Sequence, residues 1–100
     1  MHSWSLHSVP VRHPSVVDKV VDTEAVLVMP EQGMINVIND VGARVWSLID
    51  GHRRVEEIVR TICEEYNVPV DQAANDVLEF LSQLNRRGAV WPAQETDAGP

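Results

Sequence analysis

Histidine is the residue type in this chain best suited to binding a metal or moving protons, and the chain has four: His2, His7, His13 and His52. Three of them fall in the first fourteen residues, at spacings of five and six. Those spacings match no rigid set of metal ligands. We therefore expect solvated loop histidines and no metal site.

The other residues that could take part in catalysis also lack a suitable arrangement. Cys63 is the only cysteine, so the chain has neither an internal disulfide nor a thiolate cluster. No histidine or acid is spaced to activate it, which predicts a small buried apolar side chain. The paired acids Glu56-Glu57 and Glu64-Glu65 are typical of a solvated helix face, and the isolated glycines form no phosphate loop. We expect no catalytic residue, no cofactor and no enzymatic activity.

Length and charge narrow the function classes. One hundred residues with 44% hydrophobic residues and a net charge of −7 predict a single small domain with a core. An acidic surface opposes binding to nucleic acid and to anionic membranes. The start of the chain has no signal-peptide pattern, and the lone thiol fits a reducing compartment. The expected location is the cytoplasm.

The chain between Ser15 and Asn39 has the pattern of short β-strands. Three segments, at 15–21, 24–29 and 34–38, are rich in β-branched and apolar residues. Residues 30–33 suit a hairpin loop because Gly33 tolerates a positive φ. Residues 21–24 suit a second, polar turn. The pattern predicts a three-stranded antiparallel sheet in which each strand pairs with the next.

After Asn39 the apolar period lengthens from two to about 3.6 residues, which predicts helices. Asn39 or Asp40 can cap the first, which Gly51 closes. A second is expected at about 55–66, and a third from Asp71 to about Arg87.

This order of elements gives an α+β fold class: a three-stranded antiparallel sheet followed by three helices. Residues 1–14 are expected to form a flexible N-terminal arm, residues 15–91 the domain, and residues 92–100 a flexible C-terminal tail. Within the domain, residues 89–91 are expected to return as a short extended segment.

The third predicted helix has an unusually wide apolar face. At about 100° per residue, its apolar side chains spread over about 160°, whereas a surface helix needs a stripe of only about 100°. These side chains are Ala73, Ala74, Val77, Leu78, Phe80, Leu81 and Leu84. Two interpretations stay open: a second apolar ridge that overlooks the sheet, or a helix that is simply well buried.

Five segments, taken together in this order, resemble the PqqD family. They are V-L-V-M-P-E from Val26, I-N-V-I-N-D from Ile35, G-A-R-V-W-S-L-I-D-G from Gly42, V-E-E-I-V from Val55 and D-V-L-E-F-L-S-Q-L-N-R-R-G from Asp76. The resemblance covers about residues 16–91. The family comprises recognition elements for the leader peptides of ribosomally made, post-translationally modified peptides. Gly42–Trp46 is similar to the lasso-peptide B-type members, and residues 29–31 to the members of pyrroloquinoline quinone synthesis. Asn39-Asp40-Val41 departs from the usual pattern and leaves the subfamily open.

The resemblance implies a winged helix-turn-helix-like fold that binds an extended leader peptide by strand addition. The peptide would pair with the free edge of the third strand, in the groove beside the third helix. The expected strand residues are Met34, Ile35, Asn36, Val37 and Ile38. Alternation sends Met34, Asn36 and Ile38 to one face and Ile35 and Val37 to the other.

On the third helix, Val77, Phe80 and Leu84 have the i, i+3, i+7 spacing of a ridge that would receive apolar leader side chains. Asp76 and Gln83 lie at its polar margin. The alternative interpretation places all three ridge residues in the core and leaves Asp76 as a solvated helix residue.

The implied partners are a precursor peptide and its modifying enzyme, such as a radical SAM protein or a leader peptidase or cyclase. The expected oligomeric state is a monomer or a weak homodimer. A winged-helix DNA-binding regulator is the first alternative, but Asp71, Asp76 and Glu79 on its recognition helix would face phosphates. A general protein–protein adaptor is the second.

Overall fold

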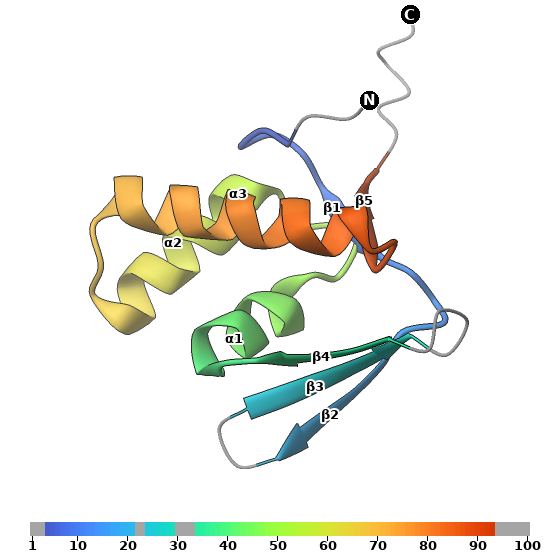
Figure 1. The fold of residues 1–100 in the computed structure, drawn as a ribbon. Coiled ribbons are helices and arrows are strands. Elements are labelled where there is room, and N and C mark those ends of the chain that lie inside the picture. The colour runs from blue at the N-terminus through green and yellow to red at the C-terminus, as the bar shows by residue number, and fades with distance from the viewer. Residues whose placement is uncertain (1–3, 22–23, 30–33, 94–100) are drawn as a thin grey trace, which may run out of the picture.

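A computed structural model describes residues 4–21, 24–29 and 34–93. Eight elements follow one another along these residues (Figure 1): β1 (Pro10–Arg12), β2 (Val17–Val21), β3 (Glu24–Met29), β4 (Met34–Ile38), α1 (Asp40–Leu48), α2 (Val55–Tyr66), α3 (Val70–Arg86) and β5 (Val90–Pro92). This order confirms the predicted α+β class and its three helices.

The larger sheet is antiparallel and has the strand order β2-β3-β4. The register runs from Ala25 opposite Ile38 to Met29 opposite Met34. Because β3 lies in the middle, β4 is an edge strand of this sheet. The predicted loop at Pro30–Gly33 and the central residues of the turn predicted at 21–24, Asp22 and Thr23, lie outside the described residues.

Asparagines mark the start of α1 and the end of α2. The Asn39 side chain accepts a hydrogen bond from the Gly42 amide at 2.8 Å, which caps α1. Helix α1 ends at Leu48, earlier than the glycine stop predicted at Gly51, which instead takes a φ of 82° in the following loop. Asn67, at a φ of 55°, ends α2 in the left-handed conformation.

The core lies between the larger sheet and the helices. Figure 1 shows α1 between this sheet and the α2–α3 pair. Leu27 of β3 and Trp46 of α1 are buried, as are Ile58 of α2 and Leu81 of α3. Each helix thus contributes its apolar face to one continuous cluster.

The N-terminal segment differs from the expected flexible arm. Pro10–Arg12 form β1, which pairs with β5 in a second antiparallel sheet, and Pro10 is fully buried. The amides of Val55 and Glu56 donate to the carbonyls of Ser8 and Leu6, at 2.9 and 3.0 Å. Since the first amides of a helix have no partner inside it, the N-terminal segment supplies acceptors that α2 needs.

Arg12 connects this second sheet to α1. Its guanidinium lies 4.6 Å from the centre of the Trp46 ring and donates a hydrogen bond to the Trp46 carbonyl. Trp46 itself is 2% exposed, as expected of a core residue. Residues 8–13 are therefore part of the packed domain, and the boundary predicted at Ser15 falls inside it.

Candidate functional site

The edge strand β4 is the first component of the candidate site. Among the described strands it pairs only with β3, so one row of its backbone N–H and C=O groups faces away from the sheet. Its sequence, M-I-N-V-I, has no proline and no charge to block pairing. The other edge strand, β2, exposes Asp18 and Lys19, which are side chains typical of a protected edge.

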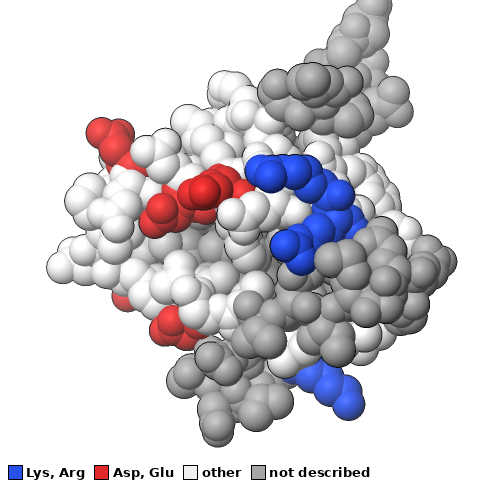
Figure 2. Space-filling view, in the orientation of Figure 1, with Lys and Arg blue, Asp and Glu red and all other residues white. Residues whose placement is uncertain are grey.

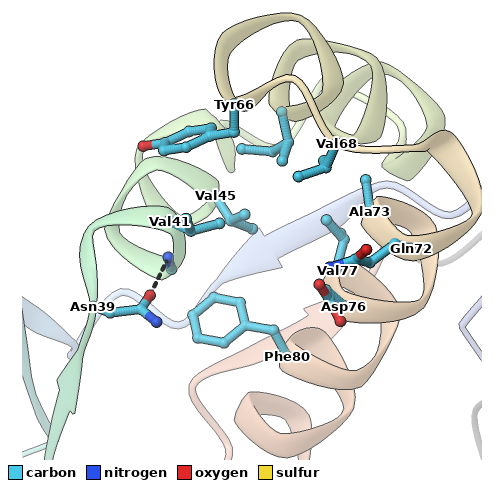
Figure 3. A pocket seen from close by; sticks show the side chains of 12 residues that line it. Asn39, Val41, Val45, Tyr66, Val68, Gln72, Ala73, Asp76, Val77 and Phe80 are labelled. Atoms are coloured by element: carbon cyan, nitrogen blue, oxygen red, sulfur yellow. Dashed lines mark hydrogen bonds between the residues drawn. The ribbon is translucent and has the colours of Figure 1, made fainter.

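The second component is a pocket that begins where β4 ends. Its cavity volume is about 330 Å³. Figure 3 shows Asn39 on one side, facing Phe80 of α3, with Tyr66 of α2 on the far side. The wall is mainly apolar and comes from α1, from the end of α2 and from the first half of α3: Asn39, Val41, Gly42, Val45, Ile62, Tyr66, Val68, Gln72, Ala73, Asp76, Val77 and Phe80.

Gly42 sets how closely α3 approaches α1 at this pocket. A Cβ atom placed on Gly42 would lie 3.3 Å from the Asn39 Oδ1 and Ile38 Cβ atoms and 3.5 Å from Phe80 Cε1. The end of β4, the start of α1 and the ring of Phe80 therefore meet at one point. Because Gly42 has no side chain, there is room for all three at this point.

The structure divides the predicted ridge of α3. Val77 and Leu84 are 2% and 3% exposed and belong to the core, although Val77 also contacts the pocket. Phe80 is half-buried and Asp76 is exposed, and both line the pocket. Gln83 is exposed and lies outside the pocket lining.

On the strand, only Ile38 has a described side chain, and it is buried. For Met34, Ile35, Asn36 and Val37 the described part is the backbone, so the predicted alternation of their faces stays a prediction.

Sequence reasoning missed the contributions of α1 and of the α2–α3 connection to this pocket. The sequence pattern assigns Val41, Val45 and Tyr66 to the packing faces of their helices, and it singles out neither Val68 nor Gln72. One signal was available: a glycine inside the helical pattern, at Gly42, often marks a close approach of another element.

The charged groups around the site are solvated. Arg44 of α1 and Glu65 of α2 form a bidentate ion pair at 2.8 and 2.7 Å, and both side chains are about 40% exposed. The hydrogen bond from Arg44 holds the pKa of Glu65 below its ordinary value of 4.5. The Tyr66 hydroxyl donates to the Asp40 carbonyl at 3.5 Å, beside the entrance to the pocket.

The histidine and cysteine side chains, which are the types best suited to chemistry, lie apart from the site. His13 accepts from the Ser15 amide through Nδ1 and packs edge-on against Trp91, with 5.6 Å between the ring centres. His7 and His52 are exposed, and His2 lies outside the described residues. Cys63 was predicted to be a buried side chain, and it is half-buried in the structure. Within residues 4–21, 24–29 and 34–93, no three His, Cys, Asp or Glu side chains are grouped to hold a metal.

None of the helices among those residues is long and apolar enough to cross a membrane.

Residues 24–90 match the family described as coenzyme PQQ synthesis protein D (PqqD). The match spans more than half of the chain and includes β3, β4, all three helices and the start of β5. The chain belongs to the PqqD family.

Two curated relatives carry the name PqqA binding protein. The protein from Rhizobium meliloti (strain 1021) is 29% identical over 82 residues, which cover 82% of this chain and 71% of the relative. The protein from Gluconobacter oxydans (strain 621H) is 32% identical over 54 residues, which cover 54% of this chain and 56% of the relative.

Solved structures share the fold. TbiB1 in complex with the TbiA(beta) leader peptide is 32% identical, with a TM-score of 0.76 over 85% of this chain and 99% of that one. The PqqD truncation of Methylobacterium extorquens PqqCD, a stand-alone recognition element for ribosomally synthesized and post-translationally modified peptides, also has a TM-score of 0.76. It is 22% identical, and the match covers 89% of this chain and 95% of that one.

Proposed function

We propose that this protein binds the leader segment of a ribosomally made precursor peptide as an added strand on β4. The observation that carries the proposal is an unpaired, uncharged strand edge that leads into an apolar pocket. The relatives support it, because TbiB1 was solved with a leader peptide and two curated relatives are PqqA binding proteins.

Each part of the site has a physical role in this mode of binding. The free edge of Met34–Ile38 supplies backbone hydrogen bonds, which bind any extended sequence. The pocket beside Phe80 supplies selectivity, since it accepts an apolar side chain of the peptide. Asp76 lies at the rim of the pocket, Gln83 is proposed to meet the peptide beyond it, and Val77 and Leu84 hold the helix against the core. A groove of this size is expected to bind a peptide with a Kd near the micromolar range, which corresponds to a binding free energy of about −8 kcal/mol.

The protein acts as a non-catalytic adaptor that presents the precursor to a modifying enzyme. A radical SAM protein and a leader peptidase or cyclase are the two enzyme classes proposed as partner. Because ribosomes make the precursor, the binding step takes place in the cytoplasm. A monomer leaves β4 free for the peptide, and a weak homodimer through the same edge would compete with it.

DNA binding is the alternative that the winged helix-turn-helix-like arrangement raises. We propose that α1–α3 and the adjoining hairpin have a winged-helix-like arrangement. Helix α3 would be the recognition helix, yet Asp71, Asp76 and Glu79 are exposed on it. Because affinity for DNA depends on neutralising phosphates, these carboxylates disfavour that function. A general adaptor role outside peptide modification is supported by no specific feature.

An NMR titration tests the proposal with three probes: the TbiA(beta) leader, PqqA, and any short precursor peptide encoded beside this gene. Binding should shift amide signals at Met34–Ile38 and along residues 76–84. It should also slow hydrogen exchange at alternate amides of β4, because only every second N–H faces the open edge. Shifts confined to other surfaces, or no binding by any probe, would rule the proposal out.

A pair of variants separates the pocket from the rest of α3. Phe80→Ala removes the half-buried ring at the pocket and should weaken peptide binding about tenfold or more, since burying a Phe side chain is worth about 1.5–3 kcal/mol. Val70→Ala is the matched control, because Val70 is 61% exposed on the same helix and lies outside this pocket. It should bind like the parent protein.

A further inference from the structure

A second pocket lies between the N-terminal segment, α2 and the start of α3. Its cavity volume is about 300 Å³, and its lining is mainly apolar with a charged rim: Leu6, Glu56, Val59, Arg60, Cys63, Glu64, Val70 and Ala74. It shares no lining residue with the pocket beside Phe80. A partner bound in this second pocket would not occupy the proposed peptide site.

Two apolar side chains of this lining are exposed to solvent. Leu6 is 42% exposed and Val70 is 61% exposed. Leu6 lies at the start of α2, because its carbonyl accepts a hydrogen bond from the Glu56 amide at 3.0 Å. Val70 begins α3, shortly after α2 ends. Covering such side chains is favourable, so the pocket offers apolar surface to a partner near both ends of α2.

Arg60 and Glu64 are the available charges of the lining. Both side chains are exposed, and neither has a hydrogen bond or an ion pair with any other residue that the structure describes. They lie one helical turn apart, but arginine ahead of glutamate is the weaker order for a pair within one helix. Glu56, the third charge of the lining, already lies 3.8 Å from Arg54. Arg60 and Glu64 therefore remain free to pair with a partner.

This arrangement is complementary to itself. A two-fold axis beside residue 62 would set α2 antiparallel to α2 of a second copy, so that Arg60 meets Glu64 of that copy and Glu64 meets its Arg60. The same rotation brings Leu6, at the start of one α2, toward the end of the other α2, where Val70 lies. Opposite charges and exposed apolar side chains are matched by one symmetry operation.

We propose that this pocket is a self-association surface whose partner is a second copy of the chain. The proposal goes beyond the proposed function and requires no peptide. Each copy has a net charge of −7, so two copies attract only where opposite charges meet at short range. On the face shown in Figure 2, acidic and basic side chains gather in separate patches along α3. A two-fold axis through either patch would bring like charges together, which disfavours that face.

Sedimentation velocity at increasing protein concentration tests the self-association. Two exposed ion pairs and a small apolar contact suit a weak dimer, with a dissociation constant on the order of 0.1 mM. The average sedimentation coefficient of the parent protein should rise with concentration and approach that of a dimer at about 1 mM. A sedimentation coefficient that stays at the monomer value over this range would overturn the proposal.

Single charge reversals test the contact between the two helices. Arg60→Glu and Glu64→Arg each place like charges at both symmetric contacts, so each should weaken the dimer about tenfold. Glu79→Arg is the matched control, because Glu79 is an exposed acid of α3 outside both pockets and the substitution changes the net charge as Glu64→Arg does. The control should associate at least as tightly as the parent. Equal effects of Glu79→Arg and Glu64→Arg would refute the assignment.

An equimolar mixture of the Arg60→Glu and Glu64→Arg proteins is the decisive sample. In a heterodimer, the two carboxylates of one variant meet the two guanidinium groups of the other at both contacts. The mixture should therefore dimerise like the parent, although each variant alone is mostly monomeric. A mixture that associates no better than its separate components would rule out this pairing. Because peptide binding at β4 is measured in a separate titration, either outcome leaves the proposed function as it stands.

Discussion

Phe80 differs from the other ridge residues of α3 because it alone is half-buried, at a pocket, while Val77 and Leu84 are covered by the core. An apolar side chain in this state still has surface to lose when a ligand arrives. The hydrophobic part of the binding free energy is available only from such surface. Among the three ridge residues, Phe80 is therefore the one expected to contribute apolar contact to a bound peptide.

Gly42→Ala should weaken peptide binding while changing stability by less than about 1 kcal/mol. An alanine gains up to about 1 kcal/mol in helix propensity, which offsets the crowding of its Cβ against Asn39 and Ile38. The same methyl group points at Phe80 and narrows the pocket. Urea unfolding and peptide anisotropy, measured on one preparation, separate the two effects. Unchanged affinity would show that the pocket takes no part in binding.

Asn39→Ala should destabilise the protein by about 1 kcal/mol, because the side chain that caps α1 is lost. Asn39→Asp is the control that keeps an acceptor for the Gly42 amide, and it should retain most of the stability. Thermal unfolding monitored by circular dichroism measures both. Equal losses in the two variants would contradict the capping role.

At the scale of elements, the limits of a helix or strand were predicted most accurately where its pattern of apolar residues was long. Helix α2 was expected at about 55–66 and is found at Val55–Tyr66, because five apolar residues at spacings of three and four leave little freedom in its limits. Strands β3 and β4 also have the expected limits, since each is a compact apolar run between turn residues.

The second sheet was not predictable in the same way. Strand β1 has three residues, too few to establish a period of two, and its partner β5 lies at the other end of the chain. The acceptors that α2 takes from Leu6 and Ser8 are backbone carbonyls, which every sequence has. The part of the pocket outside α3 was missed for a related reason: three separate elements build the pocket, and no single segment carries its pattern.

Arg12→Met should cost about 2 kcal/mol of stability. It removes a cation–π contact worth about 0.5–2 kcal/mol and leaves the Trp46 carbonyl without this donor, while it keeps much of the apolar stem. Arg53→Met, on an exposed ion pair with Asp50, is the matched control and should cost under about 1 kcal/mol. Chemical unfolding compares them. Equal costs would mean that β1 is not held through Arg12.

At the scale of the whole molecule, acid should weaken the fold through two carboxylates. Hydrogen bonds from Arg44 lower the pKa of Glu65, and the backbone amides of Arg53 and then His52 lower the pKa of Asp50. A depressed pKa stabilises the folded state above the ordinary values, 4.5 and 3.8, and the benefit disappears as the pH falls through the folded values.

The melting temperature should therefore fall more steeply below about pH 4.5 in the parent than in Glu65→Gln or Asp50→Asn. Glu64→Gln, beside the ion pair on the same helix, serves as the control and should follow the parent curve. Differential scanning calorimetry from neutral pH down to pH 3 measures the four proteins. Parallel curves for all of them would rule out these two groups as the acid-sensitive contacts.

The pairing of β1 with β5 brings the two ends of the domain side by side, with Pro10 opposite Pro92. A domain whose two ends lie side by side can be inserted into a surface loop of another protein without distorting that protein. The β4 edge belongs to the other sheet, so such a graft would leave it open. The domain could thus be fused to either end of an enzyme or inserted within it. Covalent tethering alone would then raise the local concentration of the bound substrate at that enzyme.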